Sequence, residues 1–287
     1  MHYGRERIVL VTGASRGAGR GIALALGKTG ATVYLTGRPE NDSNTNLSGT
    51  LSETAQQVTS AGGHGIPLYC DHSSDEQTGS VLSEIKKEHG RLDVLVNNVT
   101  DIDDAITDSG PFWEKPISLC NLLSVGLRSH YVTTWHAAPL LIAEGGGLVV
   151  NTSSFGGRIY MHGPAYGAGK AGVDKMAHDM AVDFKPFQVA VISLWMGLLL
   201  TERTKRVLDG DQDRYKDLLD SAETPEFTGH IINALADDKN LHNFSGKVLI
   251  GAELAKQYSI VDINGREPPS HRAMFGNPTE FGDTIVE

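Results

Sequence analysis

Tyr166 and Lys170 lie four residues apart and are the side chains in this sequence best suited to moving a proton. On a helix this spacing places both on one face, a single turn apart. A free tyrosine has a pKa of about 10, which is too high for easy proton exchange at neutral pH. A neighbouring ammonium stabilises the phenolate and lowers that pKa. We therefore predict that Tyr166 acts as a general acid and base with Lys170 as its partner.

A glycine-rich segment, TGASRGAG at Thr12–Gly19, separates a short apolar run from a helical pattern at Gly21–Leu26. Gly13 permits a sharp turn, Gly17 lets the backbone approach a pyrophosphate, and Gly19 lets the helix lie close to the sheet. The N-terminus of that helix presents free N–H groups to an anion. The segment therefore predicts a dinucleotide site.

Short β-branched runs alternate with helical stretches and must position these residues. Because the runs are continuously apolar, we expect strands that are buried on both faces of a parallel sheet. The predicted strands are Ile8–Val11, Thr32–Leu35, Gly65–Cys70, Val94–Asn97, Leu148–Thr152, Val189–Leu194 and Lys247–Ile250. The alternation predicts one doubly wound, Rossmann-type α/β domain of about seven strands with helices on both faces. It would span residues 1–287, with a core at 6–251 and a C-terminal extension at 252–287.

Two stretches depart from this alternation. Pro39–Gly49 is polar and rich in turn formers, which predicts a surface loop. A helix should follow it, because Thr50 and Glu53 have the spacing of a capping box. The proline-containing tail from Gly265 is predicted to be irregular, and packing on a neighbouring subunit is an alternative for it.

Composition narrows the classes of partner and compartment. The chain has 287 residues, is 40% hydrophobic and carries a formal net charge of −10, which disfavours nucleic acid and anionic membranes as partners. The longest apolar run, Val189–Leu200, is shorter than the roughly 18 residues of a membrane span. The N-terminal residues show no secretory pattern, and we interpret Cys70 and Cys120 as reduced thiols. We expect a soluble, cytoplasmic protein.

The eleven histidines do not form a His-Glu-x-x-His motif, and no Cys-x-x-Cys pair is present. Those spacings are typical of zinc sites. We therefore predict no metal site and interpret the histidines as isolated surface residues.

The second predicted strand ends in Thr36-Gly37-Arg38. A carboxylate at this point would bind a ribose 2′-hydroxyl and repel a 2′-phosphate. No acid is present, and the Arg38 guanidinium can form a charge-assisted fork to phosphate. Arg16 in the glycine loop supplies a second cation. This pattern favours NADP(H), and the alternative is that both arginines are solvated surface charges.

The Gly-x3-Gly-x-Gly spacing, the Asn97-Asn98 pair and the Tyr166-x3-Lys170 pair resemble the short-chain dehydrogenases/reductases from about Ile8 to Ile250. The resemblance implies that Lys170 also holds the nicotinamide ribose and that a serine after the fifth strand binds the substrate oxygen. The catalytic residues it implies are Ser154, Tyr166, Lys170 and Ser124. The cofactor-binding residues it implies are Gly13, Ser15, Arg16, Gly17, Gly19, Arg38, Asp71 (to the adenine), Asn97, Tyr166, Lys170, Gly197 and Thr201.

The serine that binds the substrate oxygen could be either of two residues. The sequence also differs from the family pattern at three places. Ser154 fits by its following glycine, whereas the spacing of many relatives would select Ser153. Val99-Thr100 replaces Ala-Gly after the asparagine pair. Ser124 stands where the family has an Asn that anchors a water leading to the lysine, which puts the proton relay in doubt. Met196 replaces the proline before Gly197. These departures motivate an alternative function, a catalytically weak NADP-binding sensor or scaffold.

The leading hypothesis is an NADPH-dependent oxidoreductase that interconverts a carbonyl and an alcohol on a small hydrophobic substrate. Several stretches resemble one subgroup of the family that is thought to reduce steroid and xenobiotic carbonyls. The candidates for substrate-facing residues, each of which could instead be core, are Phe112, Trp113, Phe155, Tyr160, His162, Met196 and Leu198–Leu200. Gly167 and Gly169 would allow close helix packing, and many relatives assemble through this helix. We therefore expect a homodimer or homotetramer.

Overall fold

A computed structural model describes residues 6–39, 48–209, 219 and 221–286. Seven parallel strands form one sheet in the order β3-β2-β1-β4-β5-β6-β7. The strands are β1 (Ile8–Val11), β2 (Thr32–Gly37), β3 (His64–Tyr69), β4 (Val94–Asn97), β5 (Gly147–Ser153), β6 (Val189–Trp195) and β7 (Val248–Ile250). The predicted doubly wound α/β fold is therefore confirmed. The strand order reverses between β1 and β4, which is where ligands bind in such sheets.

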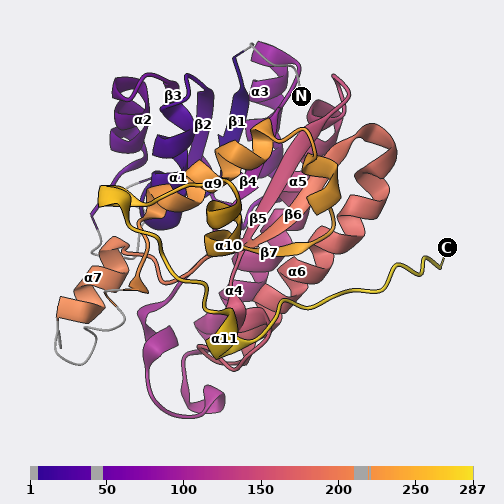
Figure 1. Ribbon diagram of the computed structural model, residues 1–287. Helices are drawn as coiled ribbons and strands as arrows, with labels where there is room; N and C mark the ends of the chain where they lie inside the picture. The colour runs from indigo at the N-terminus through magenta and orange to yellow at the C-terminus, as the bar shows by residue number, and fades with distance from the viewer. Residues whose placement is uncertain (1–5, 40–47, 210–218, 220, 287) are drawn as a thin grey trace.

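Helices cover both faces of the sheet (Figure 1). One layer contains α1 (Gly17–Gly27), α2 (Leu51–Ser60), α9 (Pro225–Asp237) and α10 (Gly251–Gln257). The other layer contains α3 (Asp75–His89), α5 (Ser129–Leu141) and α6 (Pro164–Phe184). Among the described helices, none is both long and apolar enough to cross a bilayer.

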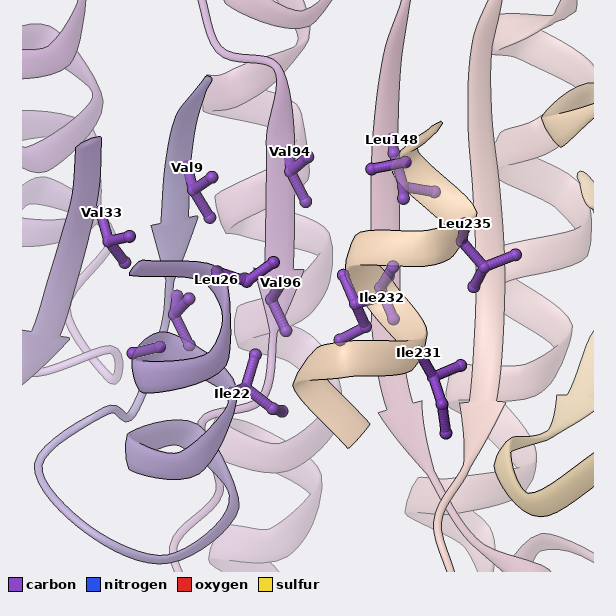
Figure 2. Packing of buried hydrophobic residues seen from close by; sticks show 14 of the residues in the cluster. Val9, Ile22, Leu26, Val33, Val94, Val96, Leu148, Ile231, Ile232 and Leu235 are labelled. Carbon is purple, nitrogen blue, oxygen red and sulfur yellow. The ribbon is translucent and has the colours of Figure 1, made fainter. Parts of the chain in front are cut away.

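Alternation along the strands builds two cores from one sheet, because successive side chains point to opposite faces. Val9 points toward α1 and α9, whereas Leu10 points toward the α3–α5–α6 layer, and both are fully buried. Figure 2 shows the first of these cores, in which Ile22 and Leu26 of α1 face the strands beside α9. The continuous apolar runs of the sequence are explained by this double burial.

The third strand differs from its prediction. The run at Gly65–Cys70 was expected to be buried on both faces, yet β3 lies at the sheet edge and three of its six residues are exposed. Pro67 fits this position, because a proline cannot complete the hydrogen-bond ladder of a central strand. Its apolar residues instead pack on the α3 side only.

Local signals at the helix ends explain where several helices begin and end. Thr50 and Glu53 form the predicted capping box at the start of α2. Pro164 lies in the first turn of α6, where a missing N–H has no consequence. Most of the predicted loop Pro39–Gly49 falls on residues 40–47, which lie outside the described part of the chain.

The first part of the C-terminal tail packs on its own chain, whereas residues 283–286 are exposed and extend away from it (Figure 1). Phe275, in the short helix α11 (Arg272–Phe275), lies 5.3 Å from Phe155 between ring centroids. Phe281 contacts the His178 ring of α6 at the same centroid distance. The tail therefore closes an aromatic cluster next to the predicted serine loop.

Candidate active site

Three of the predicted catalytic side chains converge where β5 leads into α6. The Ser154 and Tyr166 hydroxyls are 2.8 Å apart. Lys170 lies one turn further along α6, with its ammonium 5.8 Å from the centroid of the Tyr166 ring. Its Nζ donates a hydrogen bond to the Thr152 carbonyl at 3.0 Å. Consecutive elements thus hold the hydroxyl, phenol and ammonium together.

Burial dominates the proton affinities of this group. Burial raises the pKa of Tyr166, and the Ser154 hydrogen bond opposes that rise only in part. The net lowering of the Tyr166 pKa that the sequence predicted is therefore wrong for this structure, because burial dominates. Burial lowers the pKa of Lys170 to about 8, with the Asp174 carboxylate opposing the change. Lys170 remains mainly an ammonium at neutral pH.

The two serines of the NTSSFGG segment have different surroundings. Ser154 begins the short 3-10 turn Phe155–Gly157, and its oxygen also accepts the Gly156 N–H. Ser153 is the last residue of β5 and is fully buried. Its hydroxyl contacts the Lys170 carbonyl at 3.5 Å. Only Ser154 contacts the Tyr166 phenol.

Ser124 is not brought to the other catalytic candidates by any described contact. It is exposed at the start of a π-helical turn, Ser124–Arg128, and its hydroxyl has no hydrogen bond within the described residues. A shorter side chain than Asn gives it less reach. The π-helical turn also makes room for Thr100, which replaces the family's glycine. A β-carbon on Gly126 of this turn would lie 2.9 Å from the Thr100 hydroxyl oxygen, so the glycine leaves space for the larger side chain.

The other two departures from the family pattern are also accommodated. Val99 donates its N–H to the Thr12 hydroxyl at 3.1 Å and accepts a bond from the His130 ring through its carbonyl. Met196 donates its N–H to the Ser153 carbonyl at 3.2 Å, which a proline could not do. The methionine therefore ties the end of β6 to the serine loop.

The glycine loop has the backbone that its sequence predicts, with one difference. Gly13 and Gly17 adopt φ values of +67° and +57°. A β-carbon on Gly19 would lie only 2.2 Å from the Gly13 carbonyl oxygen and 2.6 Å from the Asn98 amide nitrogen. Gly19 is thus needed for the turn itself, and the close helix contact belongs to Gly21, where a β-carbon would meet Pro225 of α9 at 2.3 Å.

An anion already occupies the N-terminus of α1. The Gly17 N–H donates a hydrogen bond to Glu202 Oε2 at 2.9 Å, and Arg20 pairs with the other oxygen at 3.4 Å. Glu202 begins helix α7 (Glu202–Asp209), directly after Thr201. A carboxylate therefore stands in for the phosphate oxygens that the helix terminus was predicted to bind.

The two predicted phosphate-binding arginines lie close enough for their charges to interact. Burial lowers the pKa of Arg16, Glu202 opposes this, and Arg38 adds to it. The Arg38 guanidinium pairs at 3.5 Å with Asp101, which lies in the loop that follows β4. Both members of that pair are about one-third exposed, with side-chain exposures of 36% and 32%. The cations are therefore adjacent and held by carboxylates.

The two asparagine side chains make different contacts, which could not be predicted from the sequence. The Asn97 side chain is fully buried and donates to Thr134 and Asn151, at 2.9 and 2.8 Å. Its Oδ1 has no hydrogen-bond partner among the described residues. Asn98 instead braces the glycine loop, because its amide donates to the carbonyls of Thr12 and Gly13.

The remaining cofactor candidates lie around this loop. Asp71, two residues beyond β3, accepts the Ser73 N–H at 2.9 Å. A β-carbon on Gly17 would contact the Thr201 methyl at 3.6 Å, and one on Gly37 would lie 3.6 Å from the Ser15 side chain. Gly197 donates its N–H to Glu223 at 3.0 Å. Burial raises the pKa of the Glu223 carboxyl to about 7, although that hydrogen bond opposes the rise.

Two histidines contradict the interpretation of all histidines as surface residues. His72 and His130 are buried, and burial lowers their pKa values to about 4 and about 3. His72 bonds to the Thr36 hydroxyl at 2.7 Å, so it is a neutral core residue. The described residues bring together no group of three His, Cys, Asp or Glu side chains able to hold a metal. Both cysteines are free thiols.

The candidate substrate-facing residues divide into three groups, of which the half-buried one contains Met196, Leu198 and Leu200. Phe155 and Leu199 are buried, and the Phe155 ring packs on Trp195 with centroids 4.8 Å apart. Phe155 is therefore a core residue. Phe112, Trp113 and Tyr160 are strongly exposed.

Sequence reasoning missed four acids at or near the site. They are Asp101, Asp174, Glu202 and Glu223. Only Asp174 could have been found from the sequence, because it lies four residues beyond Lys170 on the same helix.

Comparison with known proteins agrees with this architecture. Residues 7–212 match the short chain dehydrogenase family. Dehydrogenase/reductase SDR family member 1 of Mus musculus is 43% identical over 91% of this chain and 85% of its own length. The Homo sapiens protein of that name is 41% identical over 91% and 84%. A short chain dehydrogenase structure from Mycobacterium thermoresistibile superposes with a TM-score of 0.77 at 20% identity, covering 93% of this chain and 92% of that one, and shows the common fold. The chain belongs to the short-chain dehydrogenase/reductase family, whose members bind a nicotinamide cofactor.

Proposed function

We propose that this protein is an NADP(H)-dependent oxidoreductase that interconverts a carbonyl and an alcohol on a small hydrophobic substrate. The observation that carries the proposal is the 2.8 Å contact between the Ser154 and Tyr166 hydroxyls, with Lys170 one helical turn away. Two hydroxyls beside an ammonium form a site that can bind a carbonyl oxygen and give it a proton.

The residues present fit a dinucleotide. The Gly17 N–H donates to the Glu202 carboxylate at the N-terminus of α1, which supports its assignment as a donor to an anion. Gly13, Gly17 and Gly19 keep the backbone free of β-carbons there, and Asn98 braces the turn. When bound, NADPH would supply the hydride for the carbonyl carbon. Lys170 and Thr201 are the residues we assign to its nicotinamide end.

The chain's own residues supply the proton. The Ser154 hydroxyl hydrogen-bonds the substrate oxygen and orients it toward Tyr166. Because burial raises the pKa of Tyr166, the phenol is protonated at neutral pH and can donate its proton to that oxygen. The Lys170 ammonium then stabilises the phenolate that remains.

Preference for NADP(H) over NAD(H) rests on the arginines. Arg38 follows β2 with no carboxylate on that strand end, and Arg16 lies near enough to affect its charge. A 2′-phosphate would replace Asp101 as the partner of Arg38 and gain charge-assisted hydrogen bonds. Both arginines would then act on the same phosphate.

We further propose a soluble, cytoplasmic homodimer or homotetramer. Helix α5 supports this, because its Tyr131 and Trp135 side chains are 53% and 64% exposed. A β-carbon on Gly172 of α6 would meet Leu127 at 2.8 Å, so the π-helical turn before α5 already packs closely on α6 within one subunit. Sedimentation of the purified chain tests the oligomeric state, and a monomer at all concentrations would contradict it.

The function is tested by following NADPH and NADH oxidation against a panel of quinones, diketones, aldehydes and keto-steroids. Saturable oxidation with one carbonyl, faster with NADPH than with NADH, is the expected result. Tight NADPH binding without turnover of any panel member would instead favour a sensor or scaffold on the same fold. Equal rates with both cofactors would contradict the role given to Arg16 and Arg38.

A further inference from the structure

Asp174 lies on α6 at the same four-residue spacing from Lys170 that separates Lys170 from Tyr166. The three side chains therefore follow one stripe of the helix. Asp174 is 2% exposed, while Tyr166 and Lys170 lie nearer the surface. The acid is the innermost member of a row that ends at the proposed proton donor.

Three donors from neighbouring elements hold this buried carboxylate. The Ser193 hydroxyl of β6 donates to Oδ1 at 2.6 Å. The Trp195 indole N–H reaches both carboxylate oxygens, at 3.1 and 3.0 Å. Ser153 contributes a further side-chain hydrogen bond. Hydrogen bonds of this kind stabilise the ionised form of an acid, so the site is built for a carboxylate. Burial raises the pKa of Asp174, and these donors and Lys170 oppose the rise.

Burial disfavours the charged form of Lys170, and its hydrogen-bond acceptor in the described structure is an uncharged carbonyl. A nearby negative charge would therefore stabilise the ammonium. Tyr166 is a neutral phenol, and His130 of α5 is neutral because burial lowers its pKa to about 3. Asp174 is the group whose charge opposes the loss of the Lys170 proton.

Ser124 does not take this task. It is exposed, and its hydroxyl has no hydrogen bond to Lys170 in the described part of the chain. A buried residue must therefore stabilise the charged form of Lys170.

We propose that Asp174 is a positioning residue of the Ser154–Tyr166–Lys170 group: its fixed, buried carboxylate keeps Lys170 in the ammonium form. The inference rests on the proposed function for its effect on turnover, whereas the charge coupling itself does not depend on any reaction. Loss of the carboxylate leaves Lys170 deprotonated at lower pH, and Tyr166 then loses its electrostatic partner.

The coupling is measured by carbon-13 NMR of protein labelled at the lysine ε-carbons, with the Lys170 signal assigned by its loss in Lys170→Met. In the wild type the signal should titrate at about 8. Asp174→Asn should lower that pKa by about one unit or more. Ser193→Ala, which removes one donor and keeps the charge, should leave it unchanged. An unmoved Lys170 pKa in folded Asp174→Asn overturns the proposal.

A second measurement serves if Asp174→Asn does not fold. Coupling between two sites is reciprocal, so Lys170→Met should raise the pKa of Asp174 by the same shift. The Trp195 indole N–H signal reports that titration, because it donates to the carboxylate. Lys175→Met, which removes an exposed cation of the same helix, is the matched control. Identical Asp174 titrations in both variants would overturn the coupling.

The pH dependence of carbonyl reduction distinguishes failure of the proposed function from failure of the proposed Asp174–Lys170 coupling. It should fall in the wild type as pH rises through about 8, because Lys170 loses its proton there. In Asp174→Asn the fall should occur at lower pH by the same shift as in the NMR titration. A shifted NMR titration with no turnover in the wild type would reject the proposed function and leave the coupling intact.

Discussion

The half of the molecule that carries Tyr166 and the half that carries the glycine loop are held together in different ways. On the catalytic side, β5 and α6 are consecutive elements, and Asp174 is anchored by donors in the core. On the cofactor side, partly exposed charges from distant segments close the site, as in the Arg38–Asp101 pair and the Glu202 contact with Gly17. The proposed catalytic group is therefore formed in advance, whereas a bound dinucleotide would have to exchange existing ionic contacts for its own.

The loss of a contact should also have a smaller effect on the cofactor side than on the catalytic side. Partly exposed ion pairs contribute about 0–1 kcal/mol each, so replacing them costs little. Removing a proton donor from a reacting group affects the rate by orders of magnitude. Changes on the catalytic side should alter turnover strongly, and changes to charges on the cofactor side should alter affinity modestly.

Tyr166→Phe should give the largest effect. Without the phenolic proton, kcat for carbonyl reduction should fall about 10²- to 10⁴-fold, while NADPH affinity should change by less than about twofold. Steady-state kinetics and fluorescence titration measure the two quantities. Tyr131→Phe, on the exposed face of α5, is the control and should retain full activity. Full activity in Tyr166→Phe would break the assignment of the proton donor.

Gly19→Ala should affect the cofactor side through its backbone. The new methyl group would overlap the Gly13 carbonyl, so the loop must open and NADPH binding should weaken about tenfold or more. The free energy of unfolding should fall by about 1–3 kcal/mol. Gly21→Ala, which would press on Pro225 of α9, should lose stability similarly yet bind NADPH normally once folded. Equal binding by both variants would contradict the role of the Gly13–Gly19 contact.

Arg38→Ser should separate the two cofactors. The lost charge-assisted contact should weaken NADPH binding about tenfold and leave NADH binding within about twofold. Isothermal titration of both cofactors measures this difference. Arg128→Ser, which removes an exposed arginine paired with Asp75, should change neither. A parallel loss of both cofactors in Arg38→Ser would mean that the arginine does not read the phosphate.

Glu202→Gln should have the smallest effect and the opposite sign. Its carboxylate lies on the N–H that a pyrophosphate needs, so removing the charge should strengthen NADPH binding by about fivefold, from about 1 kcal/mol of relieved repulsion. The gain should shrink as salt screens the charges. Glu226→Gln, whose partner is Lys28 at the C-terminal end of α1, is the control. Weaker binding in Glu202→Gln would show that the carboxylate supports the cofactor instead of competing with it.

Most of the fold could be predicted from the sequence because its signals are local. Apolar runs such as Val94–Asn97 match the observed strand end to end, since a strand buried on both faces needs no polar partner. The Tyr166–Lys170 spacing was interpretable for the same reason, because one helix fixes both positions. Thr50 and Glu53 formed their capping box within three residues of each other.

The rest depends on contacts that spacing does not show. Glu202 reaches Gly17 across 185 residues, and nothing near Glu202 in the sequence marks it as the partner of a helix terminus. The raised pKa of Tyr166 depends on burial by elements from several parts of the chain. The edge position of β3 depends on strand order, which its apolar residues could not reveal.

The most direct test of the central claim is the fate of deuterium during carbonyl reduction by the wild-type protein. NADPH labelled at both C4 hydrogens is incubated with a panel carbonyl that is turned over, and the alcohol is analysed by mass spectrometry. The account predicts one deuterium on the carbinol carbon, with the hydroxyl hydrogen exchanging with water, and about 10²- to 10⁴-fold slower alcohol formation by Tyr166→Phe. An unlabelled alcohol, or tight NADPH binding without alcohol from any carbonyl, would contradict it.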